Sequence, residues 1–327
     1  MPPGIGATGF IGVAPETTMG TYVAPTVFVP VLRETLKYTE DKYYSQQLRQ
    51  QVMDSDVKPG YYHVEGEIEM EVDTNVFLYF LYASRHAIVK TGAGPYVYTF
   101  TPSTAGSTST GAGQVQKTLS ITAVRNGITF GFTGCTVGQY EFTIDDAVLK
   151  CTMTILGLAE ADQSLPTATW VAPDLLGADS HNIFTGASGV SPTFAQVEDF
   201  NGFTFSLNHN AEAQNRIKSQ RSASYVKFGK TELEITSELD FVDKTEYTNF
   251  KAATTKAIKL ESTVGGGAYS AATDGIRLQA NRVAYDQYDI ENESIDDIIM
   301  ANFTGHGLVQ TGGNAYEIGV KSAISIT

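Results

Sequence analysis

Three glutamates at alternating positions are the residues of this sequence whose type and spacing could do chemistry. Glu67, Glu69 and Glu71 belong to the run Gly-Glu-Ile-Glu-Met-Glu-Val at positions 66–72. Paired carboxylates can serve as the acid and the base of glycoside hydrolysis. Residues two apart on a β-strand point to the same side, however, and the residues between these glutamates are apolar. We therefore expect one buried and one solvated strand face, because nothing nearby indicates an aromatic sugar-binding cleft.

The other motifs that could bind a cofactor or a metal lack the context that such chemistry needs. Gly4-Ile-Gly-Ala-Thr-Gly9 has the GxGxxG spacing, but no strand precedes it and Pro15 follows closely. The five histidines have no zinc-binding spacing, and there is no P-loop and no GxSxG motif. Asp145-Asp146 and Asp296-Asp297 are more typical of turns than of a weak cation site. We expect no catalytic residue, no cofactor and no metal.

Composition narrows the function further. Asp and Glu outnumber Lys and Arg by 36 to 22, giving a formal net charge of −14, which argues against a DNA-reading protein.

Two cysteines cannot form a disulfide framework; we expect Cys151 on a buried strand face and Cys135 in a partly exposed turn. No apolar run approaches the ~20 residues of a membrane span, and the N-terminus lacks the basic region of a signal peptide. We expect synthesis and assembly in a cytoplasm.

Abundant aromatic residues, glycine and proline predict many short strands joined by turns. Residues 1–30 are rich in proline and carry one charge, which predicts an extended arm that lies against a neighbouring domain or subunit. Residues 38–60 are expected to form a long polar loop that contacts another subunit, and residues 101–114 a flexible Ser/Thr/Gly loop. We further expect helices at about 75–86 and 244–255, and strands at about 26–36, 117–123, 128–133, 147–158, 203–207, 276–283, 297–305 and 315–326.

The strand at 66–72 has a second copy. Residues 229–235 read Gly-Lys-Thr-Glu-Leu-Glu-Ile, so Glu232 and Glu234 repeat the solvated face 163 positions later. Residues 140–158 match 288–308 in the same way, at an offset of 150 over the closing strands. The sequence therefore predicts a mainly β chain with two tandem β-sandwich or β-barrel-like domains, each with a short flanking helix. The expected division is an arm at 1–30, a first domain at 31–160, a linker at 161–200 and a second domain at 201–327.

In the order of its features, the chain resembles the bacteriophage tail tube protein, or major tail protein, of long non-contractile tails. The resemblance covers roughly residues 15–85. It rests on Glu16-Thr-Thr-Met-Gly-Thr21, Pro25-Thr26, Phe28-Val-Pro-Val31, Leu36-Lys-Tyr38, the strand at 66–72 and the aromatic helix after it. It implies a β-sandwich or barrel-like fold and a virion protein whose stacked rings form a hollow tube that conducts DNA. It also implies tape-measure, tail terminator and distal tail proteins as partners.

Tail tubes of this family usually have six-fold rings of single-domain subunits, from which a duplicated chain departs. We expect three chains to imitate a ring of six; the alternative is a plain hexamer with the second halves outside. Glu67, Glu69, Glu71, Glu232 and Glu234 are the candidate residues of an acidic lumen or of contacts between rings. The alternative function is a carbohydrate-binding or adhesin module of a tail fibre or surface protein, with an enzyme third.

Overall fold

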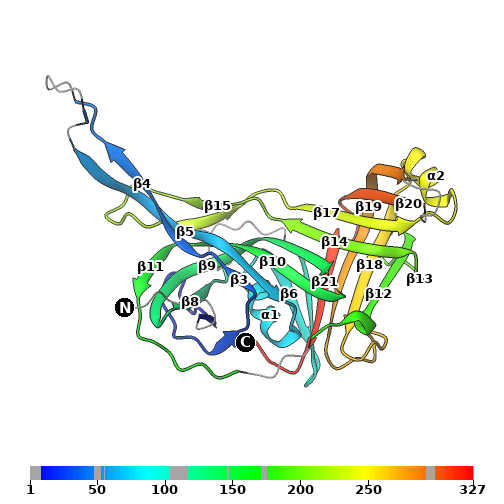
Figure 1. Cartoon of the computed structure of the whole chain (residues 1–327), viewed down its shortest axis with the longest axis horizontal. Helices are drawn as coiled ribbons and strands as arrows, with labels where there is room; N and C mark the ends of the chain where they lie inside the picture. The colour runs from blue at the N-terminus through cyan, green and yellow to red at the C-terminus, as the bar shows by residue number, and fades with distance from the viewer. Residues whose placement is uncertain are drawn as a thin grey trace.

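The fold is almost entirely antiparallel β structure with two short α-helices, as the composition predicts (Figure 1). The computed structural model describes residues 9–47, 53–54, 56–103, 116–145, 147–170, 175–291 and 299–326. Most of the Gly4–Gly9 motif, residues 104–115 of the expected flexible loop, Asp146 and the Asp296-Asp297 pair lie outside the described residues. The strands form open sheets rather than closed barrels.

The elements fall into two halves along the chain. The first half contains β1 (Phe10–Pro15), β2 (Val27–Val29), β3 (Arg33–Glu34), β4 (Lys37–Tyr44), β5 (Val57–Glu71), α1 (Thr74–Tyr82), β6 (His86–Thr91), β7 (Tyr96–Pro102), β8 (Leu119–Arg125), β9 (Ile128–Asp145), β10 (Val148–Gly157) and β11 (Ala159–Asp162). The second half contains the 3-10 turn η2 (Ala178–Ser180), β12 (His181–Ala187), β13 (Phe194–Val197), β14 (Phe200–Asn208), β15 (Ala211–Gln214), β16 (Tyr225–Phe228), β17 (Glu232–Asp240), α2 (Thr245–Lys251), β18 (Lys256–Thr263), β19 (Gly275–Glu291), β20 (Met300–Gly307) and β21 (Tyr316–Ser322).

One sheet runs through both halves, and we call it the spanning sheet. From one edge to the other its eight positions are β3 with β4, β5, β10, the C-terminal part of β9, β14, β17, β20 and the C-terminal part of β19. The N-terminal parts of β9 and β19 leave it and pair elsewhere, with β8 and β11 in the first half and with β18 and β21 in the second. The two long strands thereby connect the spanning sheet to the rest of each half.

The order of strand pairing in the first half recurs in the second. The ladder β1–β8–β9–β10–β5 matches β12–β18–β19–β20–β17, and a helix follows the last strand named in each ladder. Tyr140 faces Met153 as Tyr288 faces Phe303, in agreement with the correspondence expected for the closing segments. The β6–β7 hairpin has no counterpart, because α2 leads directly into β18.

The correspondence between the two glutamate-bearing strands differs from the expected one by six residues. Cys151 of β10 faces Met70, whereas Ala301, its counterpart in β20, faces Leu239. Met70 therefore corresponds to Leu239, an offset of 239 − 70 = 169 rather than 163. Strand side chains alternate with a period of two, so an even slip superimposes apolar and polar positions equally well. Alternation alone could not reveal the error.

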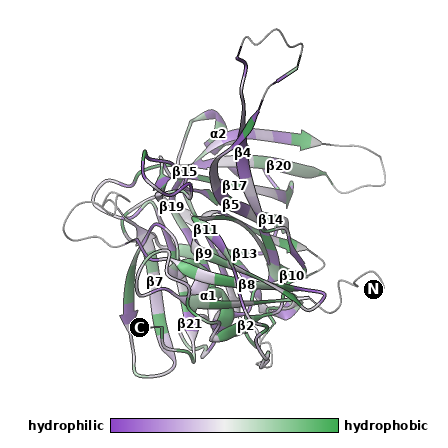
Figure 2. Ribbon diagram, turned by 90° about the vertical axis from the view of Figure 1, so that its left-hand side faces the viewer, coloured by the Kyte–Doolittle hydropathy of each residue, from purple (hydrophilic) through white to green (hydrophobic). Residues whose placement is uncertain are grey.

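Three segments that were expected to form an arm, a loop and a linker contain strands that pair within the chain. β1 and β2 pair with each other and β1 pairs with β8, so the described part of the 1–30 arm packs within its own chain, with Ile11 and Val13 buried. The 38–60 loop contains most of β4 and the start of β5, a long hairpin that projects from the body (Figures 1 and 2). The 161–200 linker contains β12 and β13, which pair onto β18 and onto each other.

Helix α1 is confirmed and lies in the core. Asp73 caps it by accepting a hydrogen bond from the Asn75 N–H at 2.8 Å, which satisfies one of the free N–H groups of the first turn. Phe77 of the helix contacts the rings of Tyr140 and Phe142 on β9. Among the described residues, no helix is long and apolar enough to cross a membrane.

Both cysteines are buried and free. Cys151 lies on the apolar strand face, as expected, but the expectation of partial exposure for Cys135 is wrong. Cys135 belongs to the long strand β9 rather than to a turn. Burial raises the pKa of both thiols well above the usual range, so neither supplies a thiolate for chemistry.

Candidate functional site: the polar face of the spanning sheet

The two faces of the spanning sheet differ sharply in chemistry. One face carries core residues such as Ile68, Met153, Phe205 and Ile235, all buried. The other face, which we call the polar face, carries residues that oppose one another across the strand ladders. Its members include Arg33, Lys37, Glu65, Glu67, Glu69, Glu71, Gln139, Glu141, Thr143, Lys150, Thr152, Thr154, Thr204, Ser206, Asn208, Glu232, Glu234, Thr236, Glu238, Gln287, Asp289, Asn302, Thr304 and His306.

All five glutamates singled out in the sequence lie on the polar face. One cross-strand row reads Glu69, Thr152, Glu141, Ser206, Glu234 and His306. Two of the five, Glu69 and Glu234, therefore stand in the same row although 165 positions separate them. Sequence reasoning missed Glu141, which fills the gap between them. The alternation Gln-Tyr-Glu-Phe-Thr at 139–143 would have signalled it.

Positive charge on the polar face gathers toward its β3–β4 edge. The Arg33 guanidinium lies 2.9 Å from the Glu67 carboxylate and 3.4 Å from that of Glu69. These groups are substantially exposed, so each contact contributes only about 0–1 kcal/mol. Lys37 similarly lies 3.3 Å from Glu65. Burial raises the pKa of Glu65, but hydrogen bonds from Thr39, His63 and Lys37 outweigh it and lower the pKa, which keeps this carboxylate ionised.

The centre of the polar face is more strongly acidic. Glu141, Glu232 and Glu234 line a shallow hollow together with Gln139, Thr204, Ser206, Asn208, Thr236 and His306. Within the part of the chain that the structure describes, Glu141 and Glu234 have no ion-pair partner. The hollow crosses the junction between the halves, where β9 pairs with β14. Its carboxylates are placed to repel a polyanion that passes over this surface.

The carboxylates of the polar face are spread along the strands rather than gathered in one cluster. The described residues contain no group of three or more His, Cys, Asp or Glu side chains that could hold a metal ion. Glu67, Glu69 and Glu71 lie at alternate positions of β5 and point to the same, solvated side of the sheet, as the alternation predicts. The chemistry that the polar face supports is electrostatic.

A second ladder joins the halves behind the polar face. β21 of the second half pairs with β7 of the first, so that Ile318 faces Phe100. Between the two junctions the rings of His86 and His209 lie 5.2 Å apart in the core. Burial lowers the pKa of His86 to about 4. The pKa of His209 is also well below its usual range, first through burial and then through the charges of His86 and Arg85.

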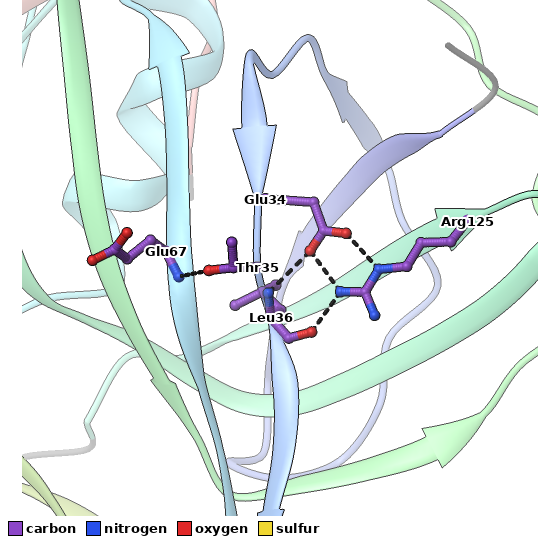
Figure 3. A network of polar contacts seen from close by, with 5 residues as sticks. All are labelled: Glu34, Thr35, Leu36, Glu67 and Arg125. Atoms are coloured by element: carbon purple, nitrogen blue, oxygen red, sulfur yellow. Dashed lines mark hydrogen bonds and ion pairs between the residues drawn. The ribbon is translucent and has the colours of Figure 1, made fainter. Parts of the chain in front are cut away.

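The two edges of the spanning sheet are open. β3 and β4 pair only with β5, and residues 284–291 of β19 pair only with β20, among the strands that the structure describes. An open edge presents unpaired backbone groups to another chain. One position is protected: Glu34 accepts the Leu36 N–H at 3.0 Å, and Arg125 donates to both the Glu34 carboxylate and the Leu36 carbonyl (Figure 3).

Comparison with known protein families gives a match over nearly the whole chain. A family model described as phage tail tube protein matches residues 6–325, which include both halves and both edges of the spanning sheet. A search of curated proteins finds no match.

Proposed function

This chain belongs to the phage tail tube protein family, and from that premise we propose that its copies form stacked rings whose shared bore conducts double-stranded DNA. The polar face of the spanning sheet lines the bore in this proposal. The observation that carries it is the row of carboxylates that continues from the first half into the second without a Lys or Arg at its centre.

A lumen that conducts DNA must not retain it. Each phosphate that Lys or Arg neutralises adds affinity that depends on salt, whereas carboxylates add repulsion. The opposite face of the sheet is unsuited to a bore, because helix α1 and the apolar core cover it. Glu67, Glu69, Glu71, Glu232 and Glu234, joined by Glu141, are accordingly the proposed lumen residues.

Three chains per ring are the stoichiometry that we propose. The pairing repeat supports two equivalent units per chain, residues 9–162 and 181–326, so three chains supply six units. Eight strand positions per chain would give a barrel of 24 strands. With strands about 4.8 Å apart and tilted by about 35–45°, its backbone would measure about 45–50 Å across. Barrels of roughly 16 to 18 strands already enclose an aqueous channel.

The β4–β5 hairpin is the proposed contact between successive rings. Tyr43, Tyr44 and Val57 are exposed on it, and it projects from the body of the chain. Apolar side chains gathered on a projecting hairpin mark a surface that another molecule covers. Family membership also supports tape-measure, tail terminator and distal tail proteins as partners, assembly in the host cytoplasm and a non-enzymatic role in the virion.

Electron microscopy of the purified protein at rising concentration tests the tube. Charge reversal then tests the lumen: tubes of the Glu141→Lys, Glu234→Lys double variant should retain DNA at low salt and release it as salt rises. Asp162→Lys, which changes an exposed residue of β11 away from the spanning sheet, is the control and should retain none. A protein that stays monomeric at every concentration would refute the tube. Equal retention by both variants would remove the polar face from the lumen.

A further inference from the structure

The junction between the two halves provides a template for the contact between chains. Within the chain, residues 139–143 of β9 pair antiparallel with residues 204–208 of β14. The counterparts of these segments in the repeat are the open edges of the spanning sheet. We propose, on the basis of the proposed tube function, that residues 287–290 of one chain pair antiparallel with residues 36–39 of the next.

The repeat fixes the register of this pairing. Tyr140 corresponds to Tyr288, an offset of 288 − 140 = 148, because both face corresponding residues of β10 and β20. On the other side, Ser206 faces Glu234 as Lys37 faces Glu65, an offset of 206 − 37 = 169. Applied to four of the five pairs of the internal junction, these offsets give Ile290 with Leu36, Asp289 with Lys37, Tyr288 with Tyr38, and Gln287 with Thr39.

The side chains that this register brings together are complementary. On the polar face Asp289 meets Lys37, a pair of opposite charges, and Gln287 meets Thr39. On the apolar face Tyr288 meets Tyr38, and aromatic cross-strand pairs stabilise antiparallel sheets. A slip of one residue would place charged side chains against aromatic ones and turn every side chain to the wrong face.

Exposure at both edges indicates a missing neighbour strand. Ile290 is 41% exposed and Tyr38 is 38% exposed, although both belong to strand faces that are otherwise apolar. Their counterparts in the internal junction, Phe142 and Leu207, are both fully buried. The difference is what a missing neighbour strand leaves. A copy of this chain is the occupant that fits, because the internal junction already shows how the two surfaces meet.

The protected position sets where the ladder starts. Arg125 and Glu34 already satisfy the backbone of Leu36 on the side away from β5 (Figure 3). Phe205, the counterpart of Leu36, instead pairs with Phe142. Backbone pairing between chains therefore begins at Tyr38, and Leu36 meets Ile290 through side chains alone. The contact is head-to-tail, since different edges meet, and such contacts generate rings when the rotation closes.

A disulfide between chains tests the register. Because the Leu36 and Tyr38 backbone groups point outward, Lys37 and Asp289 would form a non-hydrogen-bonded pair with Cα atoms about 4.5 Å apart, within disulfide range. The Lys37→Cys, Asp289→Cys double variant should oxidise to linked dimers and closed trimers on a non-reducing gel, and reductant should reverse the linkage. Cys135 and Cys151 are buried and should not interfere.

The control is the Lys37→Cys, Gln287→Cys variant, which is displaced by two residues along the same face and should link at least tenfold less. Tubes that form without the 37–289 disulfide, or equal linkage in the control, would overturn the register and leave the tube function standing. Linked closed trimers from a protein that never forms tubes would support the register while the proposed function failed.

Discussion

Glu16 shows how a single buried side chain can organise a segment that looks structureless in the sequence. It is the one charged residue of the first thirty. Its carboxylate accepts hydrogen bonds from the Gly20 and Gly134 N–H groups at 2.7 and 2.8 Å and from the Thr118 and Ser120 hydroxyls at 2.7 and 2.8 Å. Four donors satisfy the acceptor oxygens of this buried carboxylate. Glu16 thereby holds the segment after β1 against β8 and β9.

The Glu16→Ala variant should lose about 2–4 kcal/mol of unfolding free energy, because it leaves buried donors without an acceptor. Urea denaturation followed by circular dichroism measures this loss. Glu16→Gln, which keeps the shape and one acceptor oxygen, is the matched control and should lose less. If the alanine variant unfolds at the same urea concentration as the natural protein, the four hydrogen bonds do not hold the segment.

His86 makes the stability of the junction between the halves depend on pH. Its pKa falls from 6.5 to about 4 on folding, so between these values the unfolded chain binds more protons than the folded one. With respect to His86, the free energy of unfolding is therefore highest above about pH 6.5 and decreases as the pH falls toward 4. The shift corresponds to a loss on the order of 3 kcal/mol. His209 faces His86, its pKa moves in the same direction, and it reinforces the effect.

The His86→Phe variant should lose less stability than the natural protein between pH 6.5 and 4, because phenylalanine has no titratable group. The rings of Phe100, Tyr140 and Tyr316, which contact His86, provide apolar surroundings for the phenyl ring. Denaturant titrations of both proteins across this range give the comparison. Carboxylates titrate in both proteins, so the difference between the two curves isolates His86. Parallel curves would mean that His86 is not neutral in the folded state.

At the scale of elements, alternation predicted where strands lie better than it predicted which strand residues correspond to one another. The closing strands, the helix after Asp73 and the solvated glutamate faces all follow from local patterns. The correspondence between β5 and β17 did not, because a period of two cannot distinguish a slip of six residues from none. The missing information was which residues of β10 lie opposite β5 and which of β20 lie opposite β17. That is set by pairing between residues such as Met70 and Cys151, 151 − 70 = 81 positions apart, and Leu239 and Ala301, 301 − 239 = 62 positions apart.

Segments without strong alternation were the ones misjudged. β1 is buried on both sides, so it shows a continuous apolar run instead of a period. β4 and the start of β5 are exposed on both sides, so their polar residues resembled a loop. On the polar face, Glu141 lies outside the two copies of the motif, at 66–72 and 229–235, that contain the other five glutamates. The errors at β1 and at β4–β5 thus arose where burial was not one-sided, whereas Glu141 lies on a segment with one-sided burial.

The β4–β5 hairpin should be cut in free subunits and protected in tubes. Lys42 is exposed on β4 and offers trypsin a site, whereas Lys58 on β5 does not, because Pro59 follows it. If successive rings cover the hairpin, its strands become inaccessible on assembly. Limited trypsin digestion of both states, followed by mass spectrometry of the fragments, measures the protection. Equal cleavage after Lys42 in subunits and tubes would place the hairpin outside the contact between rings.

At the scale of the whole molecule, the junction within a chain and the proposed junction between chains cannot be identical. The internal junction has the β9–β14 ladder and the β7–β21 ladder. The β6–β7 hairpin has no counterpart in the described part of the second half, so the proposed junction between chains would have only a ladder of the β9–β14 kind. We therefore expect true three-fold symmetry with six similar units, rather than six-fold symmetry.

A cross-section of the tube by electron cryomicroscopy decides the number of chains. We expect three chains around the axis, with both halves of each chain in the wall. Density for the β6–β7 hairpin should occur at every second unit. Six chains around the axis, with the second halves outside the wall, would show that the polar face of the second half does not line the bore.

The covalent link between the halves has a consequence for the accuracy of construction. A ring of separate units can close with one unit too few or too many, because the rotation per unit differs from that of a six-unit ring by only about 9–12°. Chains that each bring two units already joined by β9 and β14 can make only even numbers. Rings with five or seven units therefore cannot form. The nearest faulty rings have four or eight units, which require a much larger change in the rotation between neighbouring units.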